Sequence, residues 1–369
     1  MTGAKRTGAE RGRVSDEPRP TDAGRVGGNR ELAGAEQEGE ERADSGTDGV
    51  RAGVERDEAT RRDSNALAAA AENPRARFLF VSGSRVAVEP GAERVLAVSA
   101  GCVAPEARRR AVYLGLVDGA PYFACDIGDA DDSARDPRLV SRAIPAASRP
   151  AAVAEGDERA WSVSADFASV PLTSHLWPSV EAELAVEAVA ISNWIGGTRF
   201  CHRCGEPLSL RSGGWEMVCG RGHTVFPRVD PAVIMAVRDA EDRLLLARNG
   251  RWAPGRLSVL AGFVEAGEPL ESAVAREVLE ETGVVVDDVA YVTSQPWPFP
   301  RSLMLAFEGR TRARQEDVKV DGEELVFARF FSREEFSGAL ASGEIGLPTP
   351  TSVSARLIER WLGRPLTDV

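Results

Sequence analysis

The fold of the C-terminal part of the chain is decided by the stretch Gly262-Phe-Val-Glu-Ala-Gly-Glu-Pro-Leu-Glu-Ser-Ala-Val-Ala-Arg-Glu-Val-Leu-Glu-Glu-Thr-Gly-Val284. Apolar residues recur in it at helical spacing, which predicts an amphipathic helix over residues 269–282 with a buried face made by Leu270, Ala273, Val274 and Val278. Pro269 suits the first turn, where its missing N–H is no loss, and Gly283 suits the helix end. The stretch therefore predicts a helix that follows a glycine-bounded loop.

Three carboxylates fall on one stripe of this helix, namely those of Glu277, Glu280 and Glu281. They lie near its C-terminal end, where the helix dipole disfavours negative charge, so they repel one another unless cations bind among them. The glycine-bounded loop at 261–267 allows backbone carbonyls to approach a ligand. Hard oxygen donors of this kind favour Mg²⁺ or Mn²⁺. A solvated acidic face is the alternative interpretation.

The same stretch fits the pattern G-x5-E-x7-R-E-U-x-E-E-x-G-U at every position, where U is an aliphatic residue. This pattern is the Nudix box, and on it the chain resembles the Nudix hydrolases. The resemblance implies hydrolysis of a nucleoside diphosphate linked to another group, with divalent metals held on a loop, a helix and a second loop.

Composition narrows the class of protein. The chain has 369 residues, enough for two or three domains, and its formal net charge of -12 gives no overall basic field for nucleic acid. No apolar run approaches the roughly 18 residues that cross a bilayer, and the N-terminus lacks the apolar core of a signal peptide, so no membrane contact is expected. Five cysteines, three of them close together, indicate a reducing compartment and a metal site. A cytoplasmic location is therefore expected.

Residues 1–75 have almost no large apolar side chains, so they cannot bury enough surface to offset the entropy lost on ordering. They are predicted to be a disordered tail that ends in a short helix near Leu67–Glu72. An interaction arm is the alternative, although no specific feature favours it.

Residues 76–196 are predicted to form a mixed β/α domain without a visible catalytic constellation. Strand-like runs broken by Gly and Pro lie at Arg77–Ser82, Arg85–Val88, Arg94–Val98, Ala111–Val117 and Pro121–Cys125. A helical pattern follows from Pro178 to Ile195. Cys102 and Cys125 are expected in the core, because neither has a Cys or His partner nearby.

Residues 197–226 have the spacing of a structural zinc ribbon. Cys201 and Cys204 form a tight knuckle, and fourteen residues lie between Cys204 and Cys219. Position 222 is Gly where a ribbon usually has another cysteine, so a histidine must complete the site. His202 lies inside the first knuckle and would point away. The predicted Zn²⁺ ligands are Cys201, Cys204, Cys219 and His223, and three free thiols without metal are the alternative.

Residues 227–369 are predicted to be the Nudix hydrolase domain. Strands framed by helices on both sides predict an α/β/α sandwich; the expected elements are strands at Ala232–Val237, Leu244–Ala247, Leu257–Phe263, Val284–Val286, Val289–Thr293, Ser302–Phe307 and Leu325–Phe331 and helices at Glu334–Ala341 and Ser352–Leu362. The fold class is therefore α+β, a Nudix α/β/α sandwich preceded by a zinc ribbon and an N-terminal mixed β/α domain.

A second motif reads Ser294-Gln-Pro-Trp-Pro-Phe-Pro-Arg-Ser302. Its three prolines predict a rigid loop that cannot join a sheet. Rigidity lets Trp297 and Phe299 hold fixed orientations at a reduced entropy cost, and planar rings suit a nucleobase. Gln295 and Ser302 add polar contacts. A turn with core aromatics is the alternative.

On this motif the chain resembles the NADH pyrophosphatase (NudC) family, whose zinc ribbon, F-P-R-x-D-P strand, Nudix box and S-Q-P-W-P-F-P-x-S loop occur here in the same order over residues 76–365. The resemblance implies hydrolysis of NADH or NAD⁺ to nicotinamide mononucleotide and AMP. It also implies removal of NAD caps from RNA 5′ ends. Family members are homodimers whose active site is completed across the interface, so a homodimer is expected.

The resemblance assigns roles to individual residues of this chain. The metal ligands it implies for Mg²⁺ or Mn²⁺ are the carbonyl of Ala261 and the carboxylates of Glu277, Glu281 and Glu324. The substrate contacts it implies are Phe226, Gln295, Pro296, Trp297, Pro298, Phe299, Pro300, Arg301, Ser302 and Ser354. Phe226 stands where the family often has Tyr, so a hydroxyl contact is lost there, and Ser354 stands where Ala is common.

The expected mechanism is attack by metal-activated water on phosphorus, with Glu281 or Glu280 accepting the proton. Arg276 is expected to orient the carboxylates, and Glu268 to steady the loop. Two other functions compete with this one. The first is hydrolysis of ADP-ribose or another dinucleotide, which the Trp297 motif disfavours. The second is a non-catalytic nucleic-acid-binding regulator that uses the zinc ribbon, which the intact box and acidic charge disfavour.

Overall fold

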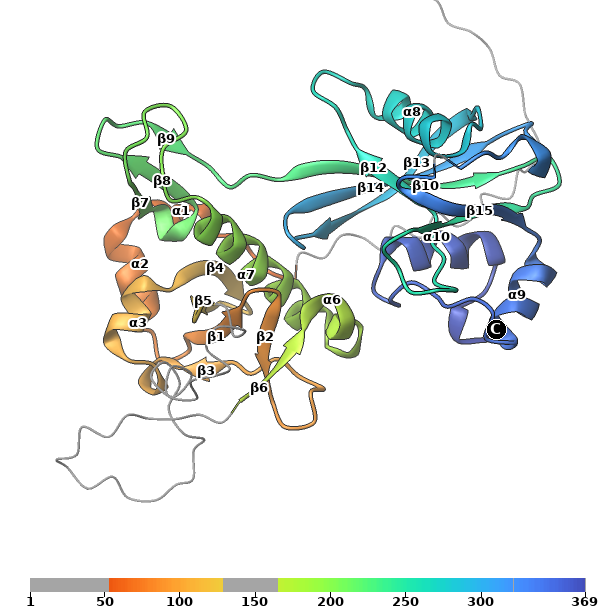
Figure 1. The fold of residues 1–369 in the computed structure, drawn as a ribbon. Helices are drawn as coiled ribbons and strands as arrows, with labels where there is room; N and C mark the ends of the chain where they lie inside the picture. The colour runs from red at the N-terminus through yellow and green to blue at the C-terminus, as the bar shows by residue number, and fades with distance from the viewer. Residues whose placement is uncertain (1–52, 129–164, 321, 369) are drawn as a thin grey trace, which may run out of the picture. The chain divides into compact units, whose positions relative to one another are not determined.

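A computed structural model describes residues 53–128, 165–320 and 322–368 (Figure 1). Three parts are distinguished below: an N-terminal lobe (53–197), a ribbon (198–226) and a C-terminal lobe (227–368). They contain a six-stranded, a three-stranded and a second six-stranded sheet, respectively. Most of the predicted tail, residues 1–52, lies outside the described residues. Among the described residues, no helix combines the length and apolar character needed to cross a bilayer.

The C-terminal lobe is built on a sheet of order β13-β14-β10-β11-β15, with β12 paired to β10. Its strands are β10 (Asp230–Arg238), β11 (Leu244–Asn249), β12 (Leu260–Phe263), β13 (Asp287–Trp297), β14 (Ser302–Arg310) and β15 (Leu325–Phe331). Its helices are α8 (Leu270–Thr282), α9 (Arg333–Ala341) and α10 (Val353–Leu362). The boundaries follow the predicted elements closely, except that 284–286 is not a strand.

Successive residues of β10 face opposite sides of this sheet. Val233 and Met235 pack in one core with the apolar face of α8. Ile234 and Ala236 pack in another core with α9 and α10. Because a strand turns alternate side chains to opposite faces, helices cover both sides of the sheet. The predicted α/β/α sandwich is confirmed, and Figure 1 shows α8 on one side and α9 and α10 on the other.

Helix α8 forms as predicted. Ala273, Val274 and Val278 are fully buried on its apolar face. Pro269 is the N-cap, and Gly283 ends the helix with a left-handed φ of 70°, a conformation that costs glycine little. The helix therefore has a fixed start, end and buried face, which fixes the direction of its glutamates.

The expectation that the proline-rich motif cannot join a sheet is wrong for its first half. Strand β13 runs through Gln295, Pro296 and Trp297 and pairs with β14, with Pro296 opposite Leu303. The physical reason is that β13 is an edge strand of the sheet, where proline is tolerated because its missing N–H can face away from the neighbouring strand.

The N-terminal lobe contains a sheet of order β4-β5-β1-β2-β6, with β3 paired to β1. Its strands are β1 (Arg77–Ser82), β2 (Arg85–Val88), β3 (Val98–Ser99), β4 (Val112–Val117), β5 (Ala120–Asp126) and β6 (Asp166–Ser169). Its helices include α3 (Pro105–Arg110), α6 (Val170–Thr173) and the long α7 (Ser179–Gly197). The predicted strand at 94–98 is reduced to β3 and a bridge between Val88 and Val95. Cys125 is buried as predicted, and Cys102 is half-buried.

The two six-stranded sheets repeat one topology. In each lobe the first and fifth strands run parallel, and the third strand pairs with the first (β1–β5 and β3–β1, β10–β14 and β12–β10). The segment between the third and fourth strands is α8 in one lobe and the six-residue α3 in the other. Helix α3 ends in Arg108, Arg109 and Arg110, where α8 ends in glutamates. The N-terminal lobe thus has a Nudix-like strand order without the acidic helix.

The prediction that a disordered tail extends to residue 75 is wrong for residues 53–72, although the short helix predicted near Leu67–Glu72 is present. Two short helices, α1 (Glu58–Arg62) and α2 (Ser64–Ala71), are capped by the side chains of Asp57 and Asp63. Val54 is buried, and Leu67 of α2 packs on the core of the lobe. The segment is held by a few long-range contacts, such as the hydrogen bond that the Tyr113 hydroxyl donates to Asp57 at 2.7 Å, which composition alone does not reveal.

The ribbon consists of β7 (Leu208–Arg211), β8 (Glu216–Cys219) and β9 (Thr224–Val225), with a tight turn at 212–214. It packs on the N-terminal lobe through Trp215. The indole Nε1 of Trp215 donates to the carbonyl of Tyr113 at 2.7 Å, and the guanidinium of Arg61 lies 3.9 Å from the indole centroid. Trp215 therefore ties the ribbon to α1 and β4, and Met217 of β8 is buried in the core of the same lobe.

Candidate active site and metal centre

The C-terminal lobe brings the four residues predicted to bind catalytic metal to two adjacent hollows. An aromatic hollow of about 260 Å³ is lined by Ala261, Glu281 and Glu324 among others. An acidic hollow of about 400 Å³ is lined by Ala261, Glu277 and Glu324. Because the two hollows share Ala261 and Glu324, residues 261, 277, 281 and 324 lie around one centre. Three carboxylates and a strand backbone are the donors that a divalent cation needs.

Gly262 leaves room for the Glu277 carboxylate, which the sequence did not predict. A Cβ at this position would lie 1.9 Å from Cδ of Glu277 and 2.1 Å from each carboxylate oxygen. Any larger residue would therefore displace the Glu277 carboxylate. The glycine lets β12 approach this carboxylate directly, beside the carbonyl of Ala261.

Arg276 holds the acidic residues in place, as predicted. Its guanidinium donates to Glu277 at 2.9 Å and to Glu280 at 3.0 Å. It also donates to both oxygens of Glu268, at 2.8 and 2.9 Å, and to the carbonyl of Phe263 at 2.9 Å. The hydrogen bond from Arg276 lowers the pKa of Glu268 to about 2. Arg276 thus ties the loop to the helix, and Glu268 steadies the loop.

The carboxylates differ in environment. Burial raises the pKa of Glu277, and the neighbouring charges of Glu280 and Glu324 raise it further, against the effect of Arg276. Glu281 is only 6% exposed. The Glu280 side chain is 60% exposed and lines neither hollow. Of the two residues predicted as candidate proton acceptors, Glu281 is the one that the fold directs into the site.

The aromatic hollow extends from the carboxylates to the proline-rich motif. Gln295, Trp297 and Ser354 line it. The Gln295 amide is held at both ends, because Nε2 donates to the carbonyl of Thr351 at 2.6 Å and Oε1 accepts from the N–H of Val353 at 2.7 Å. The Ser354 hydroxyl lies 2.7 Å from that of Ser258. These bonds fix Gln295, two residues before Trp297 on β13, against the start of α10.

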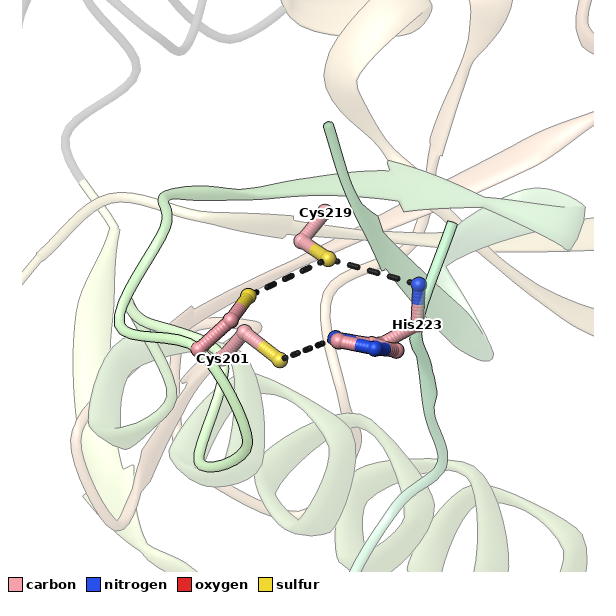
Figure 2. A group of neighbouring side chains, drawn as sticks. Cys201, Cys219 and His223 are labelled. Carbon is pink, nitrogen blue, oxygen red and sulfur yellow. Dashed lines mark hydrogen bonds between the residues drawn. The ribbon is translucent and has the colours of Figure 1, made fainter. Parts of the chain in front are cut away.

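A separate cluster lies at the base of the ribbon. Ligand atoms of Cys201, Cys204, Cys219 and His223 all lie within 4.8 Å of one another. Figure 2 shows Cys201, Cys219 and His223 directed toward one another. Sγ of Cys201 is 3.6 Å from Nδ1 of His223, and Sγ of Cys204 is 3.7 Å from Sγ of Cys219. Zn–S bonds of about 2.3 Å at tetrahedral angles place sulfurs about 3.8 Å apart, so the cluster has the dimensions of a zinc site.

The thiols of the cluster differ in pKa. The backbone N–H of Glu206 acts to lower the pKa of Cys204, but burial and the neighbouring thiols of Cys201 and Cys219 outweigh it and raise the pKa. Burial acts to raise the pKa of Cys201, but hydrogen bonds from the N–H groups of Arg203 and Cys204 and with the side chains of Cys204 and His223 outweigh it, and the pKa falls to about 6. A thiolate is the form that binds metal. His202 is exposed and lies outside the group of ligand atoms, which agrees with the predicted choice of His223.

Two family models match this chain. The model described as NUDIX domain matches residues 228–348, and that described as NADH pyrophosphatase-like rudimentary NUDIX domain matches residues 75–194. A protein named NAD-capped RNA hydrolase NudC, from Mycobacterium bovis (strain BCG / Pasteur 1173P2), is 37% identical over 321 residues, which are 84% of this chain and 93% of that protein. The chain belongs to the NADH pyrophosphatase (NudC) family of Nudix hydrolases.

A second relative covers about half of the chain. NAD-capped RNA hydrolase NUDT12 from Macaca fascicularis is 38% identical over 195 residues, 49% of this chain and 42% of that protein. The rudimentary NUDIX domain of the family corresponds to the N-terminal lobe, which accounts for the repeated strand order.

Of the substrate contacts implied by the NudC resemblance, Gln295, Trp297 and Ser354 line the aromatic hollow and Ser302 lines the acidic hollow. The others line neither hollow. Phe226 is 65% exposed and lies outside both. Phe299 packs edge-on against Trp297, with ring centroids 5.1 Å apart. Arg301 donates to Asp230 at 2.6 Å. The remaining positions outside both linings are Pro296, Pro298 and Pro300.

The structure adds residues that the sequence did not identify. Asn249, Trp252 and Arg256 line the aromatic hollow, and the guanidinium of Arg256 lies 5.3 Å from a ring centroid of Trp252. Trp252 is an exposed tryptophan between Gly250 and Gly255, a loop position where a large aromatic residue is often functional. That signal was available, but only the fold shows that this loop and Trp297 line the same hollow.

Proposed function

We propose that this protein hydrolyses the pyrophosphate bond of NADH and NAD⁺ to nicotinamide mononucleotide and AMP, and that it removes NAD caps from RNA 5′ ends. The observation that carries the proposal is that one hollow is lined both by the carboxylates of Glu281 and Glu324 and by the ring of Trp297. A dinucleotide needs both, because its pyrophosphate requires charge neutralisation and its base requires an apolar face. The name of the mycobacterial relative supports the same substrates.

Mg²⁺ or Mn²⁺ is the proposed catalytic cofactor. Glu277, Glu281, Glu324 and the carbonyl of Ala261 would hold it, since hard oxygen donors suit these ions. When bound, the cation supplies neutralisation of the pyrophosphate charge and activation of the attacking water.

The protein side chains contribute position and proton transfer. Glu281, buried in the hollow, accepts the proton of the attacking water in preference to Glu280, which is exposed and engaged with Arg276. Arg276 keeps Glu277 turned toward the acidic hollow. Gln295 acts as a positioning residue, because both ends of its amide already bind the chain.

Substrate comparison tests the proposal against its rivals. The kcat/KM values for NADH, NAD⁺, ADP-ribose and NAD-capped RNA are measured side by side with Mg²⁺. The proposal expects NADH or capped RNA to exceed ADP-ribose. A preference for ADP-ribose would replace it with the rival hydrolase, and no turnover of any of these substrates would favour the non-catalytic regulator.

Zinc is the proposed ligand of the ribbon cluster, at about one Zn²⁺ per chain. We expect His223→Ala to release zinc to a chelator faster than wild type does, because one of four ligands is lost. His202→Ala is the matched control and should retain zinc. Metal analysis of freshly purified, reduced protein with a chelator time course checks both. Faster release of zinc from the His202 variant than from the His223 variant would show that His202 is the fourth ligand. Wild-type protein without zinc would refute the proposed zinc site.

A homodimer is also proposed. Three large apolar side chains in and just after the ribbon are more than half exposed, those of Phe200, Phe226 and Val229, as expected for a surface that another subunit covers. In such a dimer Phe226 is available to substrate bound by the other subunit. Light scattering coupled to size exclusion should give twice the chain mass at micromolar concentration, whereas a monomer would remove this proposal.

The domain limits proposed from the sequence are kept with one change. The NudC-like domain, the ribbon and the Nudix domain span 76–196, 197–226 and 227–369, and the helices at 58–71 are added to the first. The five cysteines are all free, which supports a reducing compartment and hence the cytoplasmic location.

A further inference from the structure

A third hollow, of about 840 Å³, lies between the N-terminal helices and the ribbon. Among the described residues that line it, one is acidic, Glu216, and five are arginines: Arg61, Arg62, Arg109, Arg110 and Arg211. None of the residues assigned to catalytic metal, zinc or substrate lines it. On a chain with a net charge of -12, this arginine hollow is a local region of opposite sign.

The arginines come from three separate elements. Helix α1 supplies Arg61 and Arg62, helix α3 supplies Arg109 and Arg110, and the end of β7 supplies Arg211. Helix α3 has the same place in its lobe's strand order as the acidic helix α8. Where α8 presents carboxylates, α3 presents guanidinium groups, whose planar donors match phosphate oxygens without a metal.

The wall of the hollow is fixed by Arg61. Its guanidinium lies 3.9 Å from the Trp215 centroid, donates to the carbonyl of Leu114 at 3.1 Å and lies 3.6 Å from the buried carboxylate of Glu187. These contacts hold Arg61 in one orientation and offset its charge. Arg61 therefore shapes the site, and the other arginines are the ones available to an anion.

The ribbon side is fixed by the turn after Arg211. Gly213 and Gly214 have left-handed φ values of 61° and 97°. A Cβ would lie 3.1 Å from the Tyr113 side chain at Gly213 and 2.9 Å from the Val112 side chain at Gly214. The turn thus packs directly on β4, which places Arg211 beside the helices.

Four arginines remain open to a ligand. Arg110 and Arg211 are exposed and have no ion pair within the described part of the chain. Arg62 and Arg109 pair only with exposed glutamates one turn away on their own helices. Exposed pairs of this kind contribute little and exchange readily, so a stronger anion can displace them.

We propose that the arginine hollow binds the phosphate backbone of the RNA chain that follows an NAD cap. This inference rests on the proposed removal of NAD caps. A capped RNA brings a polyanion that a chain of net charge -12 repels as a whole. Guanidinium groups that neutralise backbone phosphates release counterions and so favour binding. Free NADH has no such backbone, and its hydrolysis does not need the hollow.

The test compares wild type with the double variant Arg110→Ala/Arg211→Ala. Fluorescence anisotropy measures binding of a labelled, single-stranded 5′-monophosphate RNA over a range of NaCl concentrations. Each phosphate contact contributes about 0.7 to the salt slope for single strands, so the loss of two should reduce the slope by about 1.4 and weaken binding about 25-fold at 0.1 M salt. The kcat/KM for capped RNA should fall as well, while that for NADH should stay unchanged.

The control is Arg85→Ala/Arg314→Ala, which removes two exposed arginines outside all three hollows. It loses the same charge and should keep the wild-type slope. Thermal unfolding confirms that each variant is folded. An unchanged slope in the Arg110/Arg211 variant would overturn the inference. Binding of tripolyphosphate, a small anion, is measured with the same variants. If the Arg110/Arg211 variant lost tripolyphosphate binding but kept RNA binding, the hollow would be a site for a small anion and the inference would be overturned.

The inference and the proposed function can fail separately. If wild type hydrolyses neither NADH nor capped RNA, the hydrolase proposal fails. If the Arg110/Arg211 variant still loses RNA binding in that case, the arginine hollow stands as an RNA site.

Discussion

Replacement of Glu281 by Gln is expected to lower kcat for NADH by at least ~10², with the fold intact. A carboxylate that is proposed to hold the metal becomes a neutral amide of nearly the same shape, so the site loses charge and its proposed proton acceptor while packing is preserved. Glu281 is buried against the aromatic hollow, and water cannot easily replace its carboxylate. Steady-state kinetics with saturating Mg²⁺ measure the effect.

Two neighbours on α8 serve as controls. Glu271→Gln removes a charge from the exposed first turn of the helix and should leave kcat unchanged. Glu280→Gln removes a carboxylate that pairs with Arg276 and itself lines neither hollow, so it should cost less than Glu281→Gln. Wild-type turnover in the Glu281 variant would refute its assignment as metal ligand, and a larger loss at Glu280 would reverse the choice of proton acceptor.

Trp297→Ala is expected to lower kcat/KM for NADH by about 5- to 150-fold. Stacking of a base on an aromatic ring contributes roughly 1–3 kcal/mol, and loss of that free energy appears directly in kcat/KM. The Trp297 ring lines the hollow that Glu281 also lines. Phe299→Ala should cost less, because Phe299 lies outside that lining and contacts the edge of Trp297.

A second substrate separates recognition from chemistry. Turnover of a pyrophosphate compound without the stacked base should change little in Trp297→Ala, because the metal ligands are untouched. Trp297→Phe keeps a ring and should recover part of the loss with NADH. Circular dichroism confirms the fold of each variant. A parallel fall with both substrates would show that Trp297 supports the domain and does not bind the base.

The C-terminal lobe was predictable because its signals are local. The spacing of Ala273, Val274 and Val278, bounded by Pro269 and Gly283, specifies α8 within one stretch of chain. The knuckle spacing of the ribbon is equally local, and its ligand atoms meet as expected. In both cases the residues that interact are close in sequence, so the pattern contains most of the geometry.

The N-terminal lobe was less predictable because its relation to the C-terminal lobe lies in strand pairing. The parallel pairing of β1 with β5 joins strands that have β2, β3 and β4 between them in the chain, and no residue pattern marks it. Composition also gave a wrong prediction, a disordered tail, for residues 53–72. Val54 and Leu67 pack on the core of the lobe, and the Tyr113 hydroxyl donates to Asp57 at 2.7 Å, although the segment as a whole looks polar.

The aromatic hollow shows the same limit at the site itself. Trp252, Trp297 and Ser354 come from three segments that only the folded sheet brings together. Sequence reasoning identified Trp297 from its motif but gave Phe299 an equal role. In the structure Trp297, the last residue of β13, lines the hollow, and Phe299, which follows that strand, does not.

The central claim is that the protein hydrolyses the pyrophosphate bond of NAD(H) in the aromatic hollow. The most direct measurement is mass spectrometry of the products formed from NADH by wild type and by Glu281→Gln in the presence of Mg²⁺. We predict equal amounts of AMP and reduced nicotinamide mononucleotide from wild type, at a rate at least ~10² faster than from the variant. Intact NADH after incubation with wild type, or release of nicotinamide with ADP-ribose in place of AMP, would contradict the claim.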